Sequence, residues 1–254
     1  MRLQEAKIIK NLQINSNTFL LEFPYKYNIF PSQFVMIDTY PYRLLLKPFS
    51  IAGHKDGVVQ IIYRVISDGT KYLSTQKEKI RFLGPFGNIK KAKQVLKQIK
   101  NKKVYLIAGG SGVASLIFFY NYIKKQTKDL LLIYGEKEKS SVVNLKKFGI
   151  ETSIYTTEDG SYGEKGTVVD VFLKYLKNNS IDCVICCGPK PMLKKLQELL
   201  SDKNVLSFAL LEEYMCCGVG VCRSCVVKIK NKNDFTYQTV CKDGPIFNFN
   251  EIII

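Results

Sequence analysis

The sequence predicts a multi-domain chain of the β plus α/β class. An antiparallel β-barrel is expected over residues 1–92, a doubly wound parallel α/β domain over 93–206, and a small C-terminal module over 207–254. Three observations predict this order. Short β-rich runs separated by turn residues fill the first third of the chain, strands alternate with helices in the middle, and all eight cysteines lie in the last third.

The barrel is predicted from β-rich runs of similar length at residues 7–14, 18–23, 34–40, 50–54 and 57–67. Turn residues separate them at 15–17, 31–32, 54–57 and 67–69. This regular spacing, without a long helical period, favours a closed barrel. The start of the chain has charges among its apolar positions and no small-residue cleavage site, so it is expected to form the first strand rather than a secretion signal.

Apolar runs alternate with helical runs from residue 103 onward. Strands are expected at 103–110, 129–136, 151–159, 182–188 and 204–212, and helices at 113–125, 140–148, 167–178 and 189–201. Continuous apolar strands separated by helices indicate a parallel sheet covered on both faces. Ligands of such sheets bind at the carboxyl ends of the strands.

Two loops fall at such strand ends. One follows the first strand and opens a helix, a context in which a pyrophosphate can approach the helix N-terminus; its residues are Gly109, Gly110, Ser111 and Gly112. A tight turn without a ligand is the alternative. The other loop contains Cys187, Gly188 and Pro189, and here Cys187 is either a site residue or a buried small hydrophobe.

The nucleotide preference depends on the end of the second strand of this domain. Glu136 lies there, where an acid can bind ribose hydroxyls and repel a 2′-phosphate. Lys137, Lys139 and Ser140 follow it and could have the opposite effect.

Four cysteines counted from Cys217 have the spacing C-x4-C-x2-C-x15-C. The first three match plant-type ferredoxins, so a four-thiolate 2Fe-2S cluster is expected. Gly218 and Gly220 allow a tight loop to turn its amides toward the cluster sulfides. A structural zinc site or a redox disulfide is the alternative, although zinc sites more often carry two C-x2-C pairs.

The composition limits the other functions. The net charge of +16 comes mostly from lysines scattered along the chain, which favours a solvated surface over nucleic-acid binding. No run of eighteen apolar residues is present, so no membrane span is expected. The cysteines bunch on one predicted strand and one loop, unlike those of a secreted disulfide scaffold, which favours the cytoplasm. His54 is expected to be a solvated turn residue.

The barrel region contains LLKPFSIAG, then IYRVISDGT and then FLGPFGN. In this order they resemble the flavin-binding barrel of the ferredoxin reductase family. The resemblance implies that FAD is bound by Lys47, Pro48, Phe49, Ser50, Ile62, Tyr63, Arg64, Gly69 and Thr70. The family usually has arginine at position 47 and glycine at position 67, so Lys47 and Ser67 put the flavin affinity in question. The segment at Cys187 resembles the family's CGP segment, which implies that Ser50 and Cys187 position the hydride transfer rather than act as acid or base.

A more specific resemblance is carried, in chain order, by the segments IYRVISDGTKYLS, TTEDGSYGEKGTVVDV, CGPKPML, LLEEYMCCGVGVCRSC and VCKDGPIF. Through them almost the whole chain resembles one family within this group, the electron-transfer subunits of the B-type dihydroorotate dehydrogenases. It implies NAD rather than NADP, and an NAD site formed by Gly109, Gly110, Ser111, Gly112, Glu136, Cys187, Gly188 and Pro189. It implies that the cluster ligands are Cys217, Cys222, Cys225 and Cys241. Cys216 falls where relatives tend to have alanine.

The resemblance implies a relay. Electrons would pass from the FMN of a separate dihydroorotate dehydrogenase catalytic subunit, through the 2Fe-2S cluster and FAD, to NAD+ in pyrimidine (UMP) biosynthesis, with two copies of each subunit. FAD is needed because the cluster carries one electron and nicotinamide accepts a hydride. Three modules already occupy the chain and leave no room for the catalytic TIM barrel, so this chain is not expected to oxidise dihydroorotate itself.

Two other functions stay open. One is the small subunit of an NADP-linked ferredoxin or sulfur reductase, and the other is a zinc-stabilised, non-catalytic nucleotide-binding module. Met215, Val219 and Val221 give the cysteine loop an apolar surface that serves either to dock a partner or to pack against the chain's own barrel.

Overall fold

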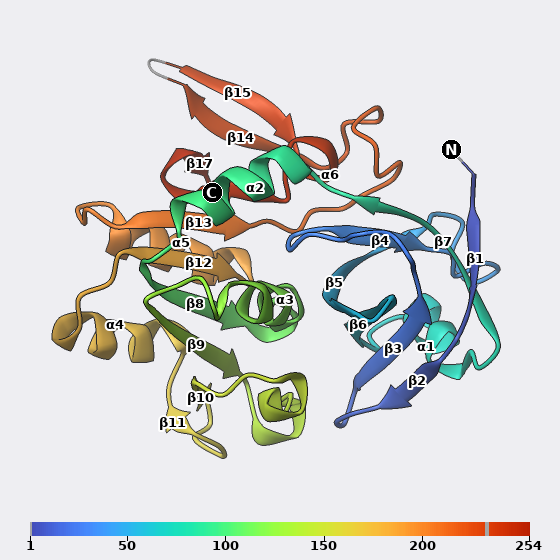
Figure 1. The fold of residues 1–254 in the computed structure, drawn as a ribbon, viewed down its shortest axis with the longest axis horizontal. Coiled ribbons are helices and arrows are strands. Elements are labelled where there is room, and N and C mark those ends of the chain that lie inside the picture. Colours follow the sequence, from blue (N-terminus) through green and yellow to red (C-terminus); the bar gives the residue numbers. More distant parts are fainter. Residues whose placement is uncertain (1, 232–233) are drawn as a thin grey trace.

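The computed structural model describes residues 2–231 and 234–254 and contains three sheets in this part of the chain (Figure 1). An antiparallel seven-stranded sheet forms the N-terminal part. A seven-stranded sheet, parallel except for its last strand, forms the middle, and a three-stranded antiparallel sheet lies near the C-terminus. The predicted fold class, a β-barrel followed by an α/β domain and a small module, is confirmed.

The two edge strands of the N-terminal sheet, β1 and β2, follow each other directly in the sequence. Its order is β1-β7-β4-β5-β6-β3-β2. The strands are β1 (Gln4–Lys7), β2 (Lys10–Gln13), β3 (Thr18–Pro24), β4 (Phe34–Ile37), β5 (Lys47–Lys55), β6 (Val58–Arg64) and β7 (Lys79–Phe86). The amide of Ile8 donates a hydrogen bond to the carbonyl of Glu78, next to β7, whereas the amide of Ile9 donates to the carbonyl of Glu22 in β3. The chain therefore passes from one edge of the sheet to the other between these two residues. The single strand predicted for residues 7–14 is therefore wrong: β1 ends at Lys7 and β2 begins at Lys10.

A helix replaces the plain turn predicted at residues 67–69. Helix α1 spans Asp68–Thr75, and Ser67 is its N-cap in a capping box with Thr70. The Thr70 hydroxyl accepts hydrogen bonds from the amides of Ile66 and Ser67, both at 3.0 Å. Threonine replaces the usual Glu or Gln at the third helical position, which explains why the start of this helix was missed.

The middle sheet has the strand order β11-β10-β9-β8-β12-β13-β16. Its strands are β8 (Lys103–Gly109), β9 (Asp129–Glu136), β10 (Ser153–Thr157), β11 (Glu164–Lys165), β12 (Cys183–Cys187), β13 (Leu206–Leu210) and β16 (Ile246–Asn248). The helices are α2 (Ile89–Gln98), α3 (Val113–Ile123), α4 (Val168–Asn178) and α5 (Lys190–Leu200), with a 3-10 turn at Gly110–Gly112 before α3. Helix α2 occupies the segment predicted as a connection.

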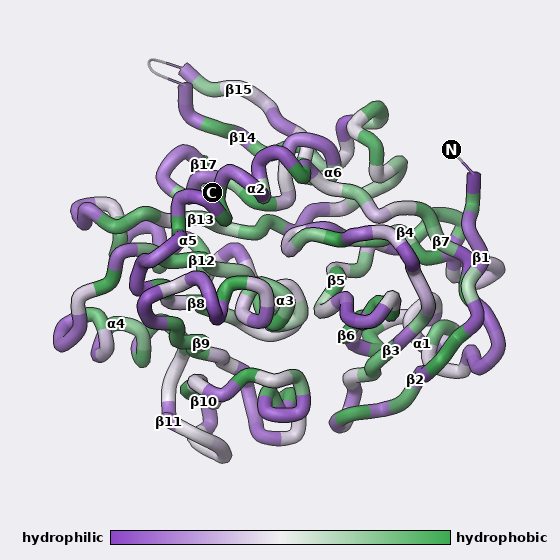
Figure 2. Tube along the Cα trace, in the orientation of Figure 1, coloured by the Kyte–Doolittle hydropathy of each residue, from purple (hydrophilic) through white to green (hydrophobic). Residues whose placement is uncertain are grey.

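The helices cover both faces of this sheet. Alternate residues of β8 point to opposite sides, so Leu106 packs in the same cluster as α2 and α3, whereas Ile107 packs with α4 and α5. Hydrophobic residues concentrate on these strands, while α2 is largely hydrophilic (Figure 2). The helix predicted at 140–148 is wrong: residues Lys139–Ser141 and Leu145–Phe148 form two separate 3-10 turns.

The C-terminal segment packs against both other parts. It contains β14 (Val226–Asn231), β15 (Asp234–Thr239), α6 (Val240–Asp243), a 3-10 turn (Phe249–Glu251) and β17 (Ile252–Ile253). Strand β13 crosses the boundary predicted between residues 206 and 207, and β16 returns to pair with β13 in the middle sheet. One buried cluster joins Met36 of the barrel, Cys241 of this segment and Phe172 of α4.

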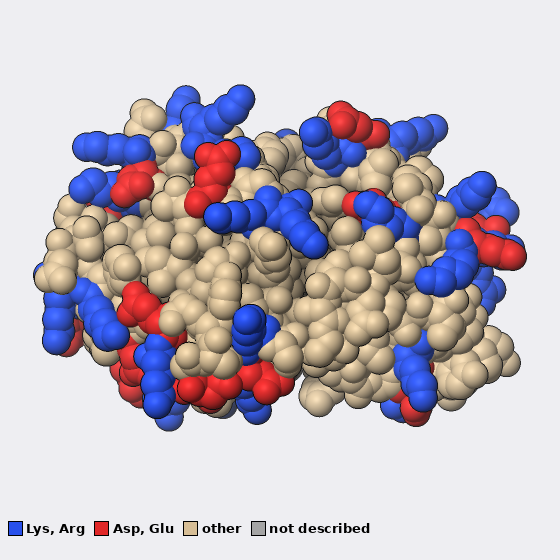
Figure 3. Space-filling view, turned by 90° about the horizontal axis from the view of Figure 1, so that it is seen from below, with Lys and Arg blue, Asp and Glu red and all other residues tan. Residues whose placement is uncertain are grey.

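The charged side chains are dispersed over the surface. On the face drawn in Figure 3, Lys and Arg alternate with Asp and Glu around wide neutral areas. Among the residues that the structure describes, no helix is both long and apolar enough to cross a bilayer.

Candidate redox and dinucleotide site

The four predicted cluster ligands form two pairs, Cys217 with Cys222 in the loop after β13, and Cys225 with Cys241 of helix α6. The amides of Val219 and Cys222 each donate to Cys217 Sγ at 3.4 Å. The Sγ atoms of Cys225 and Cys241 lie 3.3 Å apart. The loop makes these approaches because Gly218 and Gly220 adopt φ values of 72° and 82°, which L side chains rarely take.

The environments of these thiols differ in ways that bear on metal binding. Hydrogen bonds from the Ser224 side chain and backbone lower the pKa of Cys222 to about 6, which favours the thiolate. Burial, and then the neighbouring Cys225, raise the pKa of Cys241 to about 12. A bound metal would have to displace the Cys241 proton, which iron does readily because it stabilises the thiolate.

These side chains fit a 2Fe-2S cluster. All eight cysteines lie in the described residues and none forms a disulfide. In the same part of the chain, no three His, Cys, Asp or Glu side chains are close enough to hold one metal ion. The sulfurs form two pairs, Cys217 with Cys222 and Cys225 with Cys241. A cluster with two irons takes two thiolates on each iron, so paired thiols and inward amides suit it.

In the cluster-free protein, we expect Cys222 to be alkylated several-fold faster than Cys216 at pH 7.5. Both are exposed, but the pKa of Cys216 is raised by partial desolvation and by Cys222, so less thiolate forms there. Below about pH 6 the rate at Cys222 should itself fall because that thiol is protonated, whereas its advantage over Cys216 should shrink only at high pH, where the Cys216 thiolate also forms. Cys187, buried with a raised pKa, should react only on unfolding. Mass spectrometry of iodoacetamide-treated peptides measures this, and faster reaction of Cys216 would contradict it.

The predicted flavin residues lie on two neighbouring strands and a helix start. Residues 47–50 begin β5, residues 62–64 end β6, and Gly69 and Thr70 lie in the first turn of α1. The Tyr63 hydroxyl donates to Asn11 at 3.0 Å, and burial raises its pKa. Thr70 uses its hydroxyl within the helix cap, where it also donates to Ser67 at 2.9 Å. The FAD contacts of these residues stay a prediction.

A cradle at the start of α1 supports a flavin phosphate site. A Cβ added at Gly69 would lie 2.9 Å from the Thr39 hydroxyl and 3.1 Å from Arg43 Cγ, so only glycine leaves this space open. The Thr39 hydroxyl is buried without a hydrogen-bond partner among the described residues. Arg43 was missed in the sequence because it lies outside the resembling segments; it supplies a cation beside this turn.

The two predicted dinucleotide loops contact each other. Strands β8 and β12 are paired, with Ala108 opposite Cys187. A Cβ on Gly112 would lie 2.5 Å from the carbonyl oxygen of Cys187. Gly109 and Gly188 both pack against Met192. The glycines therefore let one loop lie directly on the other at the carboxyl ends of the strands.

Cys187 is buried in the apolar cluster formed by β8 and α3, with two polar groups, Ser115 and Glu212, near its thiol. Burial, and then Glu212, raise the pKa of its thiol, while Ser115 of α3 hydrogen-bonds it. Helix α3 also packs against β5, which carries Ser50. Glu212 itself is exposed and lies two residues beyond the end of β13. Sequence reasoning missed Glu212; its position shortly after a strand end was the available signal.

Comparison with known proteins agrees with this arrangement. Residues 212–253 match a family model described as the iron-sulfur cluster binding domain of dihydroorotate dehydrogenase B. Curated relatives named dihydroorotate dehydrogenase B (NAD(+)), electron transfer subunit, occur in Caldanaerobacter subterraneus, 36% identical over 98% of both chains, and in Fusobacterium nucleatum, 34% identical over the full length of both.

Solved structures give the same fold. An NADH-dependent reduced ferredoxin-NADP oxidoreductase, studied for flavin-based electron bifurcation, superposes with a TM-score of 0.84 at 25% identity, covering 98% of this chain and 89% of the other. A ferredoxin NADP+ reductase from Neisseria gonorrhoeae with bound FAD and NADP superposes with a TM-score of 0.66 at 14% identity, covering 80% of this chain and 92% of the other, which shows the fold alone.

A ferredoxin-reductase-like fold joined to an iron-sulfur module defines an electron-transfer oxidoreductase. More particularly, the chain belongs to the family of dihydroorotate dehydrogenase B (NAD(+)) electron transfer subunits. The expected cofactors FAD and 2Fe-2S, with NAD as substrate, are confirmed at the level of the family and fold. The individual ligand residues stay predictions.

Proposed function

We propose that this chain connects the FMN of a separate dihydroorotate dehydrogenase catalytic subunit to NAD+. In this proposal Cys217, Cys222, Cys225 and Cys241 hold the cluster and the barrel holds FAD. The assembly has two copies of each subunit. A bound 2Fe-2S cluster exchanges single electrons, whereas FAD exchanges single electrons or a hydride and so serves both partners. The chain itself does not oxidise dihydroorotate, and its cytoplasmic location stays a prediction from the cysteine pattern.

One observation carries this proposal: the cysteine loop packs on β4 and β7, and β4 is paired with the predicted flavin strand β5. A Cβ on Gly218 would lie 3.1 Å from Met36 Cγ and 3.4 Å from the Phe86 ring. Met36 is paired with Pro48, in the segment predicted to bind FAD. The contacts from Gly218 to Met36, and the pairing of Met36 with Pro48, support a cluster that lies next to the flavin. Met36 and Phe86 are both buried, so the contact of the cysteine loop with β4 and β7 is closed to water.

The outer side of the same loop supports docking. Val221 is 81% exposed and Tyr214 is 91% exposed, whereas Met215 and Val219 pack on the buried cluster shared with the barrel. The apolar surface predicted for the loop therefore divides between an inner and an outer part. The exposed part lies near Cys222 in sequence, where an electron donor would have to approach.

Mixing the chain with the FMN-containing dihydroorotate dehydrogenase from the same source tests the proposal. Dihydroorotate and NAD+ should yield NADH only when both proteins are present, and neither alone should react. A silent mixture, with an isolated chain that carries FAD and iron-sulfur and is reduced by NADH or NADPH, would contradict the pyrimidine role.

A second function, the small subunit of an NADP-linked ferredoxin or sulfur reductase, is favoured by one observation. The structure named above as a ferredoxin-NADP oxidoreductase superposes over nearly the whole chain. Activity with reduced ferredoxin or polysulfide in place of dihydroorotate would support it. Zinc without iron, sulfide or FAD in the purified protein would support a non-catalytic nucleotide-binding module instead.

A further inference from the structure

One segment of the chain carries many lysines and not a single acidic residue. Residues 89–128, from the start of α2 to the loop after α3, contain no aspartate or glutamate, and their lysines supply +10 of the net charge of +16. These ten residues are Lys90, Lys91, Lys93, Lys97, Lys100, Lys102, Lys103, Lys124, Lys125 and Lys128. On the face drawn in Figure 3 the two signs of charge alternate, so this segment departs from the mixed surface found there.

The two ends of this segment lie side by side, which gathers the lysines on one surface. The amide of Asn101, after α2, donates to the carbonyl of Gln126, after α3, at 2.8 Å, and the amide of Lys128 donates to the carbonyl of Lys102 at 2.9 Å. Seven of the ten lysines are exposed and form what we call the lysine face: Lys90, Lys93, Lys97, Lys100, Lys124, Lys125 and Lys128. Within residues 2–231 and 234–254, no member of this face forms an ion pair with a carboxylate.

The exposed lysines of α2 share one side of the helix. Lys90, Lys93 and Lys97 follow the i, i+3, i+7 spacing of a single stripe, and Lys100 continues it just after the helix. Val95 points to the other side, into the buried cluster that α2 shares with α3. Packing therefore uses the apolar side of α2 and leaves the lysine side free for a partner.

The lysine face begins beside the segment that carries the predicted cluster ligands. The amide of Asn88, the N-cap of α2, donates to the carbonyl of Gly244 at 2.6 Å. The Lys91 ammonium donates to the carbonyl of Asp243 at 3.4 Å. Asp243 is the last residue of α6, the helix that contains Cys241. A protein that docks over the start of α2 would therefore lie next to α6.

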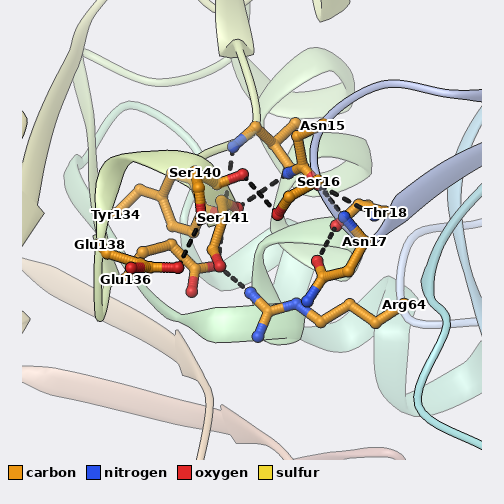
Figure 4. A network of polar contacts seen from close by, with 11 residues as sticks. Asn15, Ser16, Asn17, Thr18, Arg64, Tyr134, Glu136, Glu138, Ser140 and Ser141 are labelled. Atoms are coloured by element: carbon orange, nitrogen blue, oxygen red, sulfur yellow. Dashed lines mark hydrogen bonds and ion pairs between the residues drawn. The ribbon is translucent and has the colours of Figure 1, made fainter.

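Contacts between the barrel and the α/β domain fix this face relative to the predicted flavin strands (Figure 4). Arg64, at the end of β6, forms an ion pair with Glu136, at the end of β9. The Tyr134 hydroxyl donates to the same carboxylate oxygen at 2.6 Å, and the Asn15 side chain donates to the carbonyl of Ser141 at 2.9 Å. Because the two domains are joined in this way, a partner on α2 is held at a defined position relative to both.

The chemistry of the lysine face favours an acidic protein over the other polyanions. The aromatic residues of 89–128 are buried or half-buried, so they offer no exposed ring on which a nucleic-acid base could stack. Ile89 is the one large apolar residue exposed in this range, at 37%, which is too little to anchor the face in a lipid bilayer. Unpaired lysines beside a redox module suit a partner that has surface carboxylates and carries electrons.

We propose that the lysine face docks an acidic one-electron carrier, an iron-sulfur or flavin protein, so that the chain exchanges electrons with a second partner besides the catalytic subunit. Long-range attraction by the lysines speeds the encounter, and the position beside α6 directs the carrier to the cluster segment. In the net reaction, two reduced carriers each give up one electron, and NAD+ takes both electrons and one proton to form NADH. The proposal rests on the FAD and cluster of the proposed function, but not on its dihydroorotate role.

The first test replaces the four exposed lysines at α2 in the FAD-loaded, cluster-loaded chain, using an acidic 2Fe-2S ferredoxin as the probe. The variant combines Lys90→Gln, Lys93→Gln, Lys97→Gln and Lys100→Gln. With dithionite-reduced ferredoxin and NAD+, KM for ferredoxin at about 10 mM ionic strength should rise about tenfold, while KM for NAD+ and the FAD and iron contents stay unchanged. Near about 0.5 M salt the native chain and the variant should become alike, because salt screens exposed charges.

A control with the same loss of charge separates this face from net charge. It combines Lys146→Gln, Lys147→Gln, Lys194→Gln and Lys195→Gln, four lysines that are also exposed but lie outside residues 89–128. KM for ferredoxin should change less than twofold in this variant. An equal rise in both variants would overturn the proposal, since only the total charge would then matter.

Crosslinking of the native chain tests the location without any variant. A carbodiimide joins lysine amines to carboxylates in contact, so peptides linked to ferredoxin should map to Lys90, Lys93 and Lys97. Crosslinks confined to other lysines, or ferredoxin binding weaker than about 1 mM in calorimetry, would overturn the proposal. Binding to phosphatidylglycerol vesicles without binding to ferredoxin would overturn it in favour of a lipid surface. Failure of the dihydroorotate assay would leave these results unaffected, because they use this chain by itself.

Discussion

Replacing Cys217 by alanine is expected to remove the iron-sulfur cluster and lower electron transfer from dihydroorotate to NAD+ at least ~100-fold in the assembled complex. The Cys217 sulfur accepts the amides of Val219 and Cys222, so it is both a predicted ligand and the centre around which the loop folds. NADH oxidation by ferricyanide, which can draw electrons from FAD directly, should be largely retained. Iron and sulfide content, visible absorption and the two assays measure these effects.

Cys216→Ala provides the matched control one residue away. Cys216 is exposed and lies outside the predicted ligand spacing, so its variant should keep full iron content and full coupled activity. Loss of the cluster in Cys216→Ala with retention in Cys217→Ala would shift the ligand set by one residue. Equal loss in both would indicate that the loop is sensitive to any change at this turn, and that spacing alone does not identify the ligand.

The parts of the fold that depend on local periodicity could be predicted from the sequence. The apolar run predicted as a strand at 103–110 forms β8. Cys217, Cys222 and Cys225 lie in one loop that ends before β14. Both features depend on residues that are close in the sequence, so the local pattern could predict them. The exceptions were also local. Helix α1 has Thr70 instead of the usual Glu or Gln at the third position of its capping box. Residues 140–148 were expected to form one helix, but two separate 3-10 turns occur there, the second beginning at Leu145.

The contacts between distant residues could not be predicted in this way. Nothing in the sequence near Gly218 indicates that it packs on Met36, and nothing near Arg64 indicates Glu136. Each such contact depends on how two domains close on each other, which local pattern does not encode. Residue type alone therefore suggested a ribose contact for Glu136, but it could not indicate that Arg64 and the Tyr134 hydroxyl both bond its carboxylate.

Gly112→Ala is expected to impair the NAD site most strongly among the single-methyl changes in the glycine-rich loop. Gly112 has φ −58° at the start of α3, a conformation that alanine adopts readily, so backbone strain does not contribute. The added Cβ would lie 2.5 Å from the carbonyl oxygen and 2.6 Å from the carbonyl carbon of Cys187. Since both are backbone atoms, the ends of β8 and β12 must move apart, at a cost of about 1–3 kcal/mol in stability.

The same displacement should lower kcat/KM for NADH in ferricyanide reduction by roughly 10- to 100-fold, because a shift of about 1 Å in a positioned group has effects of that size. FAD and iron content should not change, since Gly112 contacts neither predicted site. Gly109→Ala is the matched control, because its added methyl group meets a side chain, whereas that of Gly112→Ala meets backbone atoms. Its Cβ would lie 2.4 Å from Met192 Sδ, but a thioether can rotate away, so the loss should be much smaller. Equal losses in the two variants would show that the close approach of Gly112 to Cys187 does not determine the geometry of the NAD site. A larger loss in Gly112→Ala, with normal flavin and cluster content, would show that the two loops must touch for hydride transfer to reach NAD+.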